Sequence, residues 1–139
     1  NMDAPVLVCA VTLLTTLQMA YFTRRVGYSR LAHKIKPPAT TGHPEFERAF
    51  RAHQNCVEFY PLFLVSMWSC GVFFSEPIAA AGGLVFIVGR LLYFNGYIRE
   101  THKRLPGFWV SVAVFFSLSF LGMIGIVQEI LHKYFYIYS

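Results

Sequence analysis

Two long stretches of this chain carry no charged side chain, and they limit the possible fold more than any other feature. Residues 4–23 and 105–128 contain no Asp, Glu, Lys or Arg. Lipid offers the backbone no hydrogen-bond partners, and an α-helix of about 20 apolar residues is long enough to cross its hydrocarbon core. Each stretch is therefore predicted to be a transmembrane helix.

Two further stretches are also apolar enough to span a membrane. Residues 59–75 are uncharged but include Pro61, and their predicted helix extends back into a polar segment that begins near Glu45. Residues 77–98 are apolar except for Arg90. With 55% hydrophobic and 14% charged residues, the composition is typical of a membrane protein. The sequence predicts one all-α domain over residues 1–139, an integral membrane four-helix bundle with helices at about 4–33, 45–75, 77–104 and 105–133.

The basic residues gather on one side of the predicted bundle. Of the 12 Lys and Arg, ten lie in residues 24–51 and 99–104, which connect the first helix to the second and the third to the fourth. The positive-inside rule places this side in the cytosol and both chain ends on the other side. A basic belt beside a membrane binds anionic membrane lipid, so the net charge of +5 predicts no nucleic-acid partner.

The histidines do not form a metal-binding pattern. Metal sites need His, Cys, Asp or Glu side chains at characteristic close spacings. The five histidines show no such spacing to one another or to cysteine: His33, His43, His53, His102 and His132. We predict no metal site.

Glycine recurs every seven residues in the third predicted helix, at Gly82, Gly89 and Gly96. This spacing places three positions without side chains on one helix face. Small residues on one face let a neighbouring membrane helix approach closely. We interpret the pattern as helix packing.

A polar stripe runs along the second predicted helix. Arg48, Arg51, Asn55 and Glu58 follow one another at intervals of three, four and three residues, which places them on one face. Charges at or below a membrane surface are costly unless they have partners or a function. The stripe is therefore a candidate binding surface.

The third predicted helix carries a matching stripe. Arg90, Tyr93 and Tyr97 have the same spacing, and Arg104 joins them if the helix continues until Pro106 ends it. The two stripes then meet at the basic end of the bundle.

The stripes have a structural interpretation and a functional one. Glu47 could pair with Arg51, and Glu58 could neutralise Arg90 between helices. Ion pairing, however, does not require the amide and the two tyrosines. Glutathione has two carboxylates, an ammonium, two amides and a thiol, and the complementary groups come from Arg51, Asn55, Glu58, Tyr93 and Tyr97. We therefore predict a glutathione site.

The same residues carry a resemblance to a known family. The matching stretches are Pro37-Pro38, Thr41-Gly42, Pro44-Glu45-Phe46-Glu47-Arg48, Arg51-Ala52, Asn55-Cys56, Tyr93-Phe94 and Gly96-Tyr97. They resemble the membrane-associated proteins of eicosanoid and glutathione metabolism, the MAPEG family, without gaps over about residues 10–107. Within the family, Arg30-Leu31 and residues 55–61 resemble type 2 microsomal glutathione transferases more than leukotriene C4 synthases. The synthase pattern has a second arginine in place of Leu31 and Tyr-Phe in place of Phe59-Tyr60.

The resemblance implies an enzyme of the endoplasmic reticulum or nuclear envelope that conjugates glutathione to lipophilic electrophiles such as fatty-acid epoxides. It implies that leukotriene A4 is one such substrate; its conjugation is the leukotriene C4 synthase reaction of leukotriene biosynthesis. It also implies a peroxidase reaction, the reduction of lipid hydroperoxides. It also implies a homotrimer whose sites face the cytosol and the lipid, with Arg30 and His53 contributed by a neighbouring subunit. The family usually has Gln in place of His53. The implied glutathione-binding residues are Arg30, Arg51, His53, Asn55, Glu58, Phe59, Tyr93, Tyr97 and Arg104.

Arg104 is the predicted catalytic residue. A free thiol has a pKa of about 8.5, and its thiolate is the nucleophile. Arginine stays protonated, so it is no general base but can stabilise the thiolate electrostatically. Lowering the thiol pKa by two units needs roughly 2.7 kcal/mol, within reach of one close, partly desolvated arginine.

Three other interpretations remain at this stage. Arg104 could be a solvated surface charge beside Lys103. The chain could be a non-catalytic fatty-acid-binding scaffold like 5-lipoxygenase-activating protein, although the cations at Arg51 and Arg104 favour the enzyme. A small transporter would need an isolated membrane-buried carboxylate, and the one candidate, Glu58, lies among mixed charges near the surface.

Overall fold

The computed structural model describes residues 3–135, which form four long α-helices and one short 3-10 helix. The helices are α1 (Val6–His33), α2 (Pro44–Phe73), α3 (Glu76–Arg99), the 3-10 helix η1 (Thr101–Arg104) and α4 (Leu105–Phe135). Each of the four α-helical segments is long and apolar enough to cross a membrane. The predicted all-α fold with four spans is confirmed for these residues.

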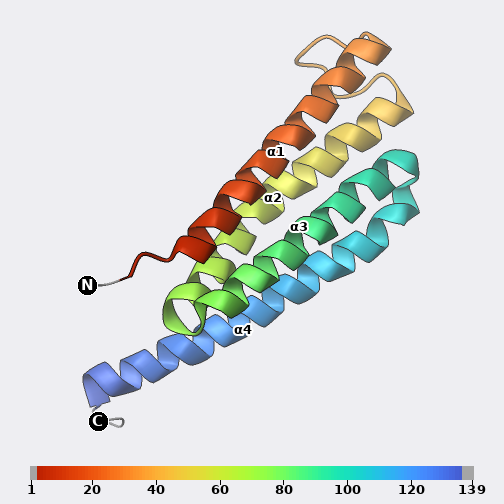
Figure 1. Ribbon diagram of the computed structural model, residues 1–139. Coiled ribbons are helices and arrows are strands. Elements are labelled where there is room, and N and C mark those ends of the chain that lie inside the picture. The colour runs from red at the N-terminus through yellow and green to blue at the C-terminus, as the bar shows by residue number, and fades with distance from the viewer. Residues whose placement is uncertain (1–2, 136–139) are drawn as a thin grey trace.

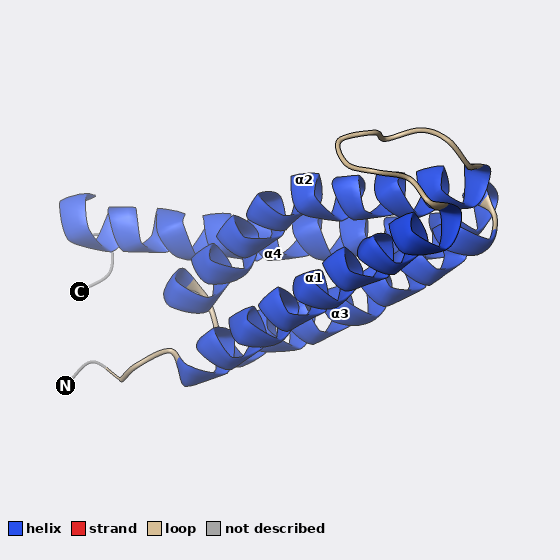
Figure 2. Cartoon of the chain, turned by 90° about the horizontal axis from the view of Figure 1, so that it is seen from above, coloured by secondary structure: helices blue, strands red, loops and turns tan. Residues whose placement is uncertain are grey.

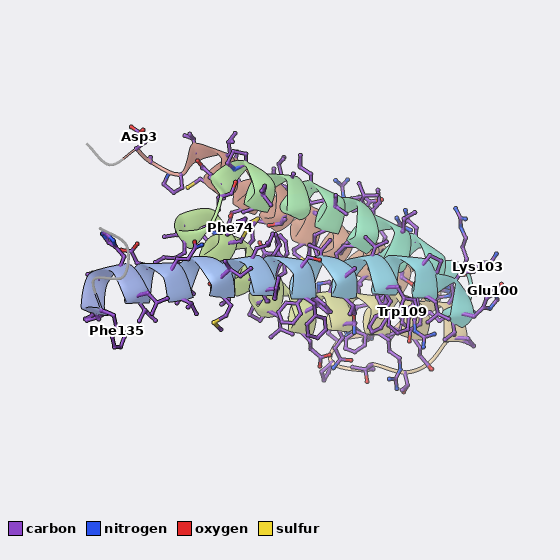
Figure 3. All side chains as sticks on the ribbon, turned by 90° about the horizontal axis from the view of Figure 1, so that it is seen from below. Asp3, Phe74, Glu100, Lys103, Trp109 and Phe135 are labelled. Carbon is purple, nitrogen blue, oxygen red and sulfur yellow. The ribbon has the colours of Figure 1, made fainter. Side chains whose placement is uncertain are left out.

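The helices run side by side, and the first and last described residues lie at the same end of the bundle (Figure 1). The long connection of residues 34–43 lies at the opposite end (Figures 1 and 2), as does η1 (Figure 1). Figure 3 shows the same division, with Glu100 and Lys103 far from Asp3 and Phe135. Both connections that carry most of the basic residues therefore meet at one end, which we call the basic end.

Local signals fix the helix starts. His43 precedes α2 and accepts a hydrogen bond from the Glu45 backbone N–H at 3.1 Å, while Pro44 occupies the first helical position. Ser75 caps α3 in the same way, since its hydroxyl accepts from the Ile78 N–H at 3.4 Å. Such caps satisfy donors at a helix N-terminus that have no partner within the helix.

The third helix ends earlier than its sequence predicts. It stops at Arg99, and Glu100 takes an extended conformation before η1 begins. Pro106 does not end this helix but lies in the first turn of α4. Proline fits there because its missing N–H would have no intrahelical partner in a first turn. The prediction of a helix continuous to Arg104 was wrong, and η1 is what positions that residue.

The helices pack closely where glycine removes the side chain. A Cβ at Gly82 would lie 2.8 Å from the Leu118 side chain, and one at Gly89 would lie 2.8 Å from Val110. At Gly96 it would overlap the backbone carbonyl of Lys103 in η1. The predicted packing role of these glycines is confirmed, and the face they form is covered by η1 and α4.

The outward surface is apolar along the length of the bundle. Leu17 on α1 and Phe120 on α4 are both 66% exposed, and Val65 on α2 is 67% exposed. Isolated apolar residues are common on soluble proteins, but continuous apolar faces on several helices need an apolar partner. Membrane lipid or a further protein surface supplies that partner.

A hydroxyl cluster joins α1 to α2. The Tyr60 hydroxyl lies 2.9 Å from the hydroxyl oxygens of both Thr15 and Thr16. Hydrogen bonds between membrane helices average about 0.6 kcal/mol and reach about 1.7 kcal/mol. Tyr60 therefore stabilises the fold, and its hydroxyl points to α1.

Replacing Tyr60 with Phe is expected to destabilise the protein by about 1 kcal/mol, because it removes both of these contacts and keeps the ring. The loss is measured as a lower unfolding midpoint in detergent. Tyr134→Phe, at a tyrosine that is 68% exposed on α4, is the matched control and should leave the midpoint unchanged. Equal midpoints for the two variants would contradict the role of the cluster.

Candidate functional site

A cavity of about 360 Å³ opens between α2, α3 and the start of α4. It is the meeting point of the two predicted polar stripes. Its lining residues are Arg51, Gln54, Asn55, Glu58, Tyr93, Tyr97, Arg104, Leu105 and Phe108. The structure thus brings together six residues that the sequence assigned to the site, from three separate segments.

Most polar groups of the cavity are free to bind a ligand. Within residues 3–135, the side chains of Arg51, Gln54 and Glu58 make no hydrogen bond or ion pair to another residue. The hydroxyls of Tyr93 and Tyr97 likewise have no hydrogen-bond partner in this part of the chain. A cation, a carboxylate, an amide and two hydroxyls facing one space suit a ligand with several charged and polar groups.

Arg104 is held at the edge of this cavity by two contacts. Its Nη1 donates to the Thr101 carbonyl oxygen at 2.6 Å, and its guanidinium carbon lies 5.4 Å from the centre of the Tyr97 ring. Both contacts depend on the tight turn of η1. The side chain is half-buried, so its charge is neither fully solvated nor neutralised by a carboxylate of the described residues. This is the setting in which a cation interacts strongly with a nearby anion.

Arg90 lies behind the cavity and is 1% exposed. Its Nη1 donates to Asn55 Oδ1 at 2.9 Å, and its Nε donates to the Ser111 hydroxyl at 2.8 Å. The alternative in which Glu58 neutralises Arg90 was therefore wrong, since the ion pairs of the described residues do not include either side chain. Glu58 remains available in the cavity.

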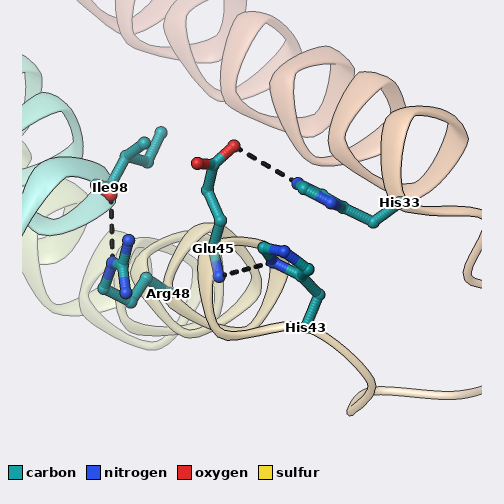
Figure 4. A network of polar contacts seen from close by, with 5 residues as sticks. All are labelled: His33, His43, Glu45, Arg48 and Ile98. Carbon is teal, nitrogen blue, oxygen red and sulfur yellow. Dashed lines mark hydrogen bonds and ion pairs between the residues drawn. The ribbon is translucent and has the colours of Figure 1, made fainter.

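The stripe on α2 differs by one residue from its prediction. Arg48 leaves it, because its Nε donates to the Ile98 carbonyl oxygen at the end of α3, at 3.0 Å (Figure 4). Gln54 takes part instead. The sequence contained this signal, since Gln54 lies three residues after Arg51 and four before Glu58.

Figure 4 also shows why the N-terminal turn of α2 belongs to the scaffold. His33 Nε2 of α1 lies 3.2 Å from Glu45 Oε1, and the His33 and His43 rings stack with their centres 3.8 Å apart. Glu47 accepts from the Gly42 N–H at 3.1 Å and does not pair with Arg51. These contacts close the long connection between α1 and α2 and leave Arg51 unpaired within residues 3–135.

Three predicted site residues do not line the cavity of the single chain. The Arg30 guanidinium lies 4.8 Å from the centre of the Phe46 ring and donates to the Ala39 carbonyl at 2.7 Å. His53 Nε2 lies 3.0 Å from the Thr23 hydroxyl. The Phe59 ring lies behind the cavity, where its centre is 4.9 Å from the Arg90 guanidinium carbon.

Leu105 and Phe108 are cavity residues that the sequence did not reveal. They reach the site because α4 begins directly after η1 and its first turn faces Tyr93 and Tyr97. Both are apolar residues in an apolar stretch, so no spacing pattern distinguishes them from core residues.

Comparison with known proteins identifies the family. The MAPEG family pattern matches residues 7–124, most of the chain. This chain belongs to the MAPEG family. Human microsomal glutathione S-transferase 2 is 47% identical to it over 129 residues, which cover 93% of this chain and 88% of the human protein. Leukotriene C4 synthase of Cavia porcellus is 44% identical over 129 residues, 93% of this chain and 86% of its own length.

The MAPEG assignment agrees with the four apolar helices. The sequence predicted this family from motifs around Arg51, Asn55 and Tyr93, and the prediction is confirmed. Together, the family and the four helices make this chain an integral membrane protein. These three motif residues all line the cavity.

Proposed function

We propose that this protein is a membrane glutathione S-transferase, which adds the thiolate of glutathione to lipophilic electrophiles. The observation that carries the proposal is the cavity in which Arg51, Asn55, Glu58, Tyr93, Tyr97 and Arg104 converge. The names of the relatives, a microsomal glutathione S-transferase and a leukotriene C4 synthase, support the same chemistry.

The free groups of the cavity match those of glutathione. Glu58 offers a carboxylate to the ammonium of the ligand, and Arg51 offers a bidentate donor to a carboxylate. The hydroxyls of Tyr93 and Tyr97 and the amide of Gln54 complement the peptide groups. No metal takes part in this scheme.

Arg104 stabilises the thiolate in this proposal. Its guanidinium stays charged and supplies no base, so the thiol proton leaves to water. The thiolate sulfur then attacks an electrophilic carbon of the second substrate and forms a carbon–sulfur bond. The bond from that carbon to the epoxide oxygen or to the leaving group breaks, that oxygen or group takes the electron pair, and the epoxide oxygen is then protonated by water. The apolar side chains of Leu105 and Phe108 border this position and favour a lipophilic substrate. Leukotriene A4, an epoxide, is the proposed physiological electrophile. Lipid hydroperoxides are a second proposed substrate class, for which two glutathione thiols are oxidised to the disulfide while the O–O bond is reduced to an alcohol and water.

We further propose that the active unit is a homotrimer. Arg30 and His53 lie away from the cavity of their own chain, as expected of residues that complete a neighbouring subunit's site. The exposed apolar faces of the helices offer surface for subunit contacts and for lipid. The basic end, which holds the cavity, faces the cytosol by the positive-inside rule, in the endoplasmic reticulum or nuclear envelope.

Titration of the purified protein with glutathione in a calorimeter tests the proposal. Parallel assays with chlorodinitrobenzene, leukotriene A4 and a lipid hydroperoxide then define the preferred reaction by their rate ratios. Glutathione binding without turnover of any of the three would favour the alternative, a non-catalytic scaffold that binds fatty acids. Absence of glutathione binding would refute the proposal.

Replacing Glu58 with Gln is expected to weaken glutathione binding at least tenfold, because the ammonium of the ligand loses its charged partner. A charge-assisted hydrogen bond contributes about 1.5–3 kcal/mol, which corresponds to roughly ten- to hundredfold in affinity. Calorimetry measures the change. Arg24→Gln is the control, because the contacts of Arg24 are to Tyr28 on the exposed face of α1. Its affinity should match the wild type.

A further inference from the structure

Arg90 is a buried cation without a carboxylate partner among the described residues. Its side chain contacts Asn55, Cys56 and Ser111, and no ion pair of residues 3–135 includes it. Its guanidinium carbon lies 4.4 Å from the centre of the Tyr93 ring, which partly compensates the charge. Nη2 is buried and lacks any hydrogen-bond partner in the described part of the chain. A buried guanidinium without a carboxylate partner raises the free energy of a membrane helix, so its presence points to a functional role.

The contact to Asn55 has a chemical consequence. A guanidinium carries five N–H donors and no acceptor, so the atom of Asn55 that faces Arg90 must be its amide oxygen. The distance from Arg90 Nη1 to Asn55 Oδ1 is 2.9 Å. The amide nitrogen is therefore the atom left for the cavity, which Asn55 lines. Without Arg90, the amide could turn either end toward a ligand.

We propose that Arg90 is a positioning residue that fixes the Asn55 amide, so that the site presents an N–H donor and binds an acceptor group of the ligand there. The inference rests on the proposed function and deepens it: the ligand group at Asn55 is a carboxylate or a peptide carbonyl of glutathione, and its ammonium binds elsewhere. The Ser111 hydroxyl accepts from Arg90 Nε at 2.8 Å and donates in turn to the Gly107 carbonyl oxygen at 2.8 Å.

Asn55→Asp tests the proposal, because the proposal predicts weaker glutathione binding and its opposite predicts equal or tighter binding. Aspartate has almost the same shape, and one of its oxygens can accept from Arg90 while the other replaces the N–H donor that faces the cavity. Glutathione should bind at least tenfold more weakly, because two acceptors then face each other. Equal or tighter binding would mean that Asn55 accepts from the ligand, and would overturn the proposal.

A second measurement does not depend on glutathione. Asn55→Asp gives Arg90 a carboxylate partner, so its unfolding midpoint in detergent should rise above that of the wild type. The gain should disappear when Arg90 is also replaced by Met. If Asn55→Asp does not raise the unfolding midpoint when Arg90 is present, the contact between Arg90 and residue 55 is refuted. A rise that persists in the Arg90→Met background would refute it as well. If wild-type protein does not bind glutathione, the proposed function fails and this cycle alone decides the role of Arg90.

Ser66→Ala serves as the matched control for Arg90→Met. It also removes a buried polar group from a membrane helix, but the Ser66 hydroxyl donates to the Phe63 carbonyl oxygen within α2 at 2.8 Å, and Ser66 does not line the cavity. Arg90→Met should reduce glutathione affinity at least tenfold and lose no further affinity when Asn55→Ala is added. Ser66→Ala should keep affinity within about twofold of the wild type. Equal losses in the Arg90 and Ser66 variants would assign Arg90 a purely structural role and overturn the proposal.

Discussion

Replacing Arg104 with Gln is expected to lower the turnover number of glutathione conjugation about 100-fold and to reduce glutathione affinity much less. The removal of one preorganised group that stabilises developing charge typically lowers kcat by about 10²–10³. In the free protein, Arg104 is held by Thr101 and Tyr97 at the cavity edge, so its charge is already in position. Chlorodinitrobenzene conjugation measures the turnover number, and the ultraviolet absorbance of bound thiolate measures how far the thiol is ionised. Calorimetry measures the glutathione affinity.

Lys103→Gln is the control for this prediction. Lys103 precedes Arg104 in η1 and is exposed, and its Nζ lies 3.6 Å from Glu100 Oε2, so its replacement removes the same charge without touching the cavity. Arg104→Lys should fall between the wild type and Arg104→Gln, because it keeps the charge but loses the planar donors. Unchanged turnover and thiolate absorbance in Arg104→Gln would contradict the catalytic role of this residue.

Replacing Gly107 with Ala is expected to destabilise the protein by about 3 kcal/mol and to abolish most of its activity. A Cβ at this position would overlap the backbone of Tyr93 and of Gly89, and neither can move without shifting α3 away from α4. Overpacking in a close-packed interior typically costs about 1–3 kcal/mol. Because Tyr93 lines the cavity, the shift also displaces a wall of the site.

Gly125→Ala separates the loss of stability from the loss of activity expected for Gly107→Ala. A Cβ at Gly125 would also overlap a backbone group, the Phe73 carbonyl, but between α4 and α2 at the opposite end of the bundle. The unfolding midpoint should fall similarly, while kcat at a permissive temperature should stay near the wild-type value. Gly27→Ala should affect neither property, because a Cβ there would meet no neighbouring group of the described chain within 4 Å. Equal activity losses in Gly107→Ala and Gly125→Ala would show that stability alone is responsible.

The residues of a regular helix could be placed from the sequence, because helical spacing fixes which side chains share a face. Arg51, Asn55 and Glu58 lie together in the cavity as predicted, and so do Tyr93 and Tyr97. The spacing did not decide between Arg48 and Gln54, because both are compatible with the same stripe. The carbonyl of Ile98, on another helix, draws Arg48 away.

The position of Arg104 could not be derived by extending the helix. The chain leaves α3 at Arg99 and returns through η1, so Arg104 reaches the cavity by a turn. That turn depends on Gly96, which packs against the Lys103 carbonyl, a contact distant from the stripe pattern. The partners of Arg90 were also hidden, since a single sequence does not tell which polar groups of α2 and α4 lie opposite it.

The cavity lies at the end of the bundle opposite the first and last described residues, Asp3 and Phe135, and this has a consequence for cell biology. Because the four helices are long enough to span a membrane, a reporter placed next to either of these residues is expected to lie across the membrane from the cavity. The compartment opposite the reporter would then be the one whose thiol pool supplies the proposed reaction. If that compartment is the cytosol, its reducing glutathione keeps the substrate thiol available, whereas the oxidising lumen would convert much of it to disulfide. The side of the membrane on which the reporter is accessible would thus identify the compartment that supplies glutathione to the cavity.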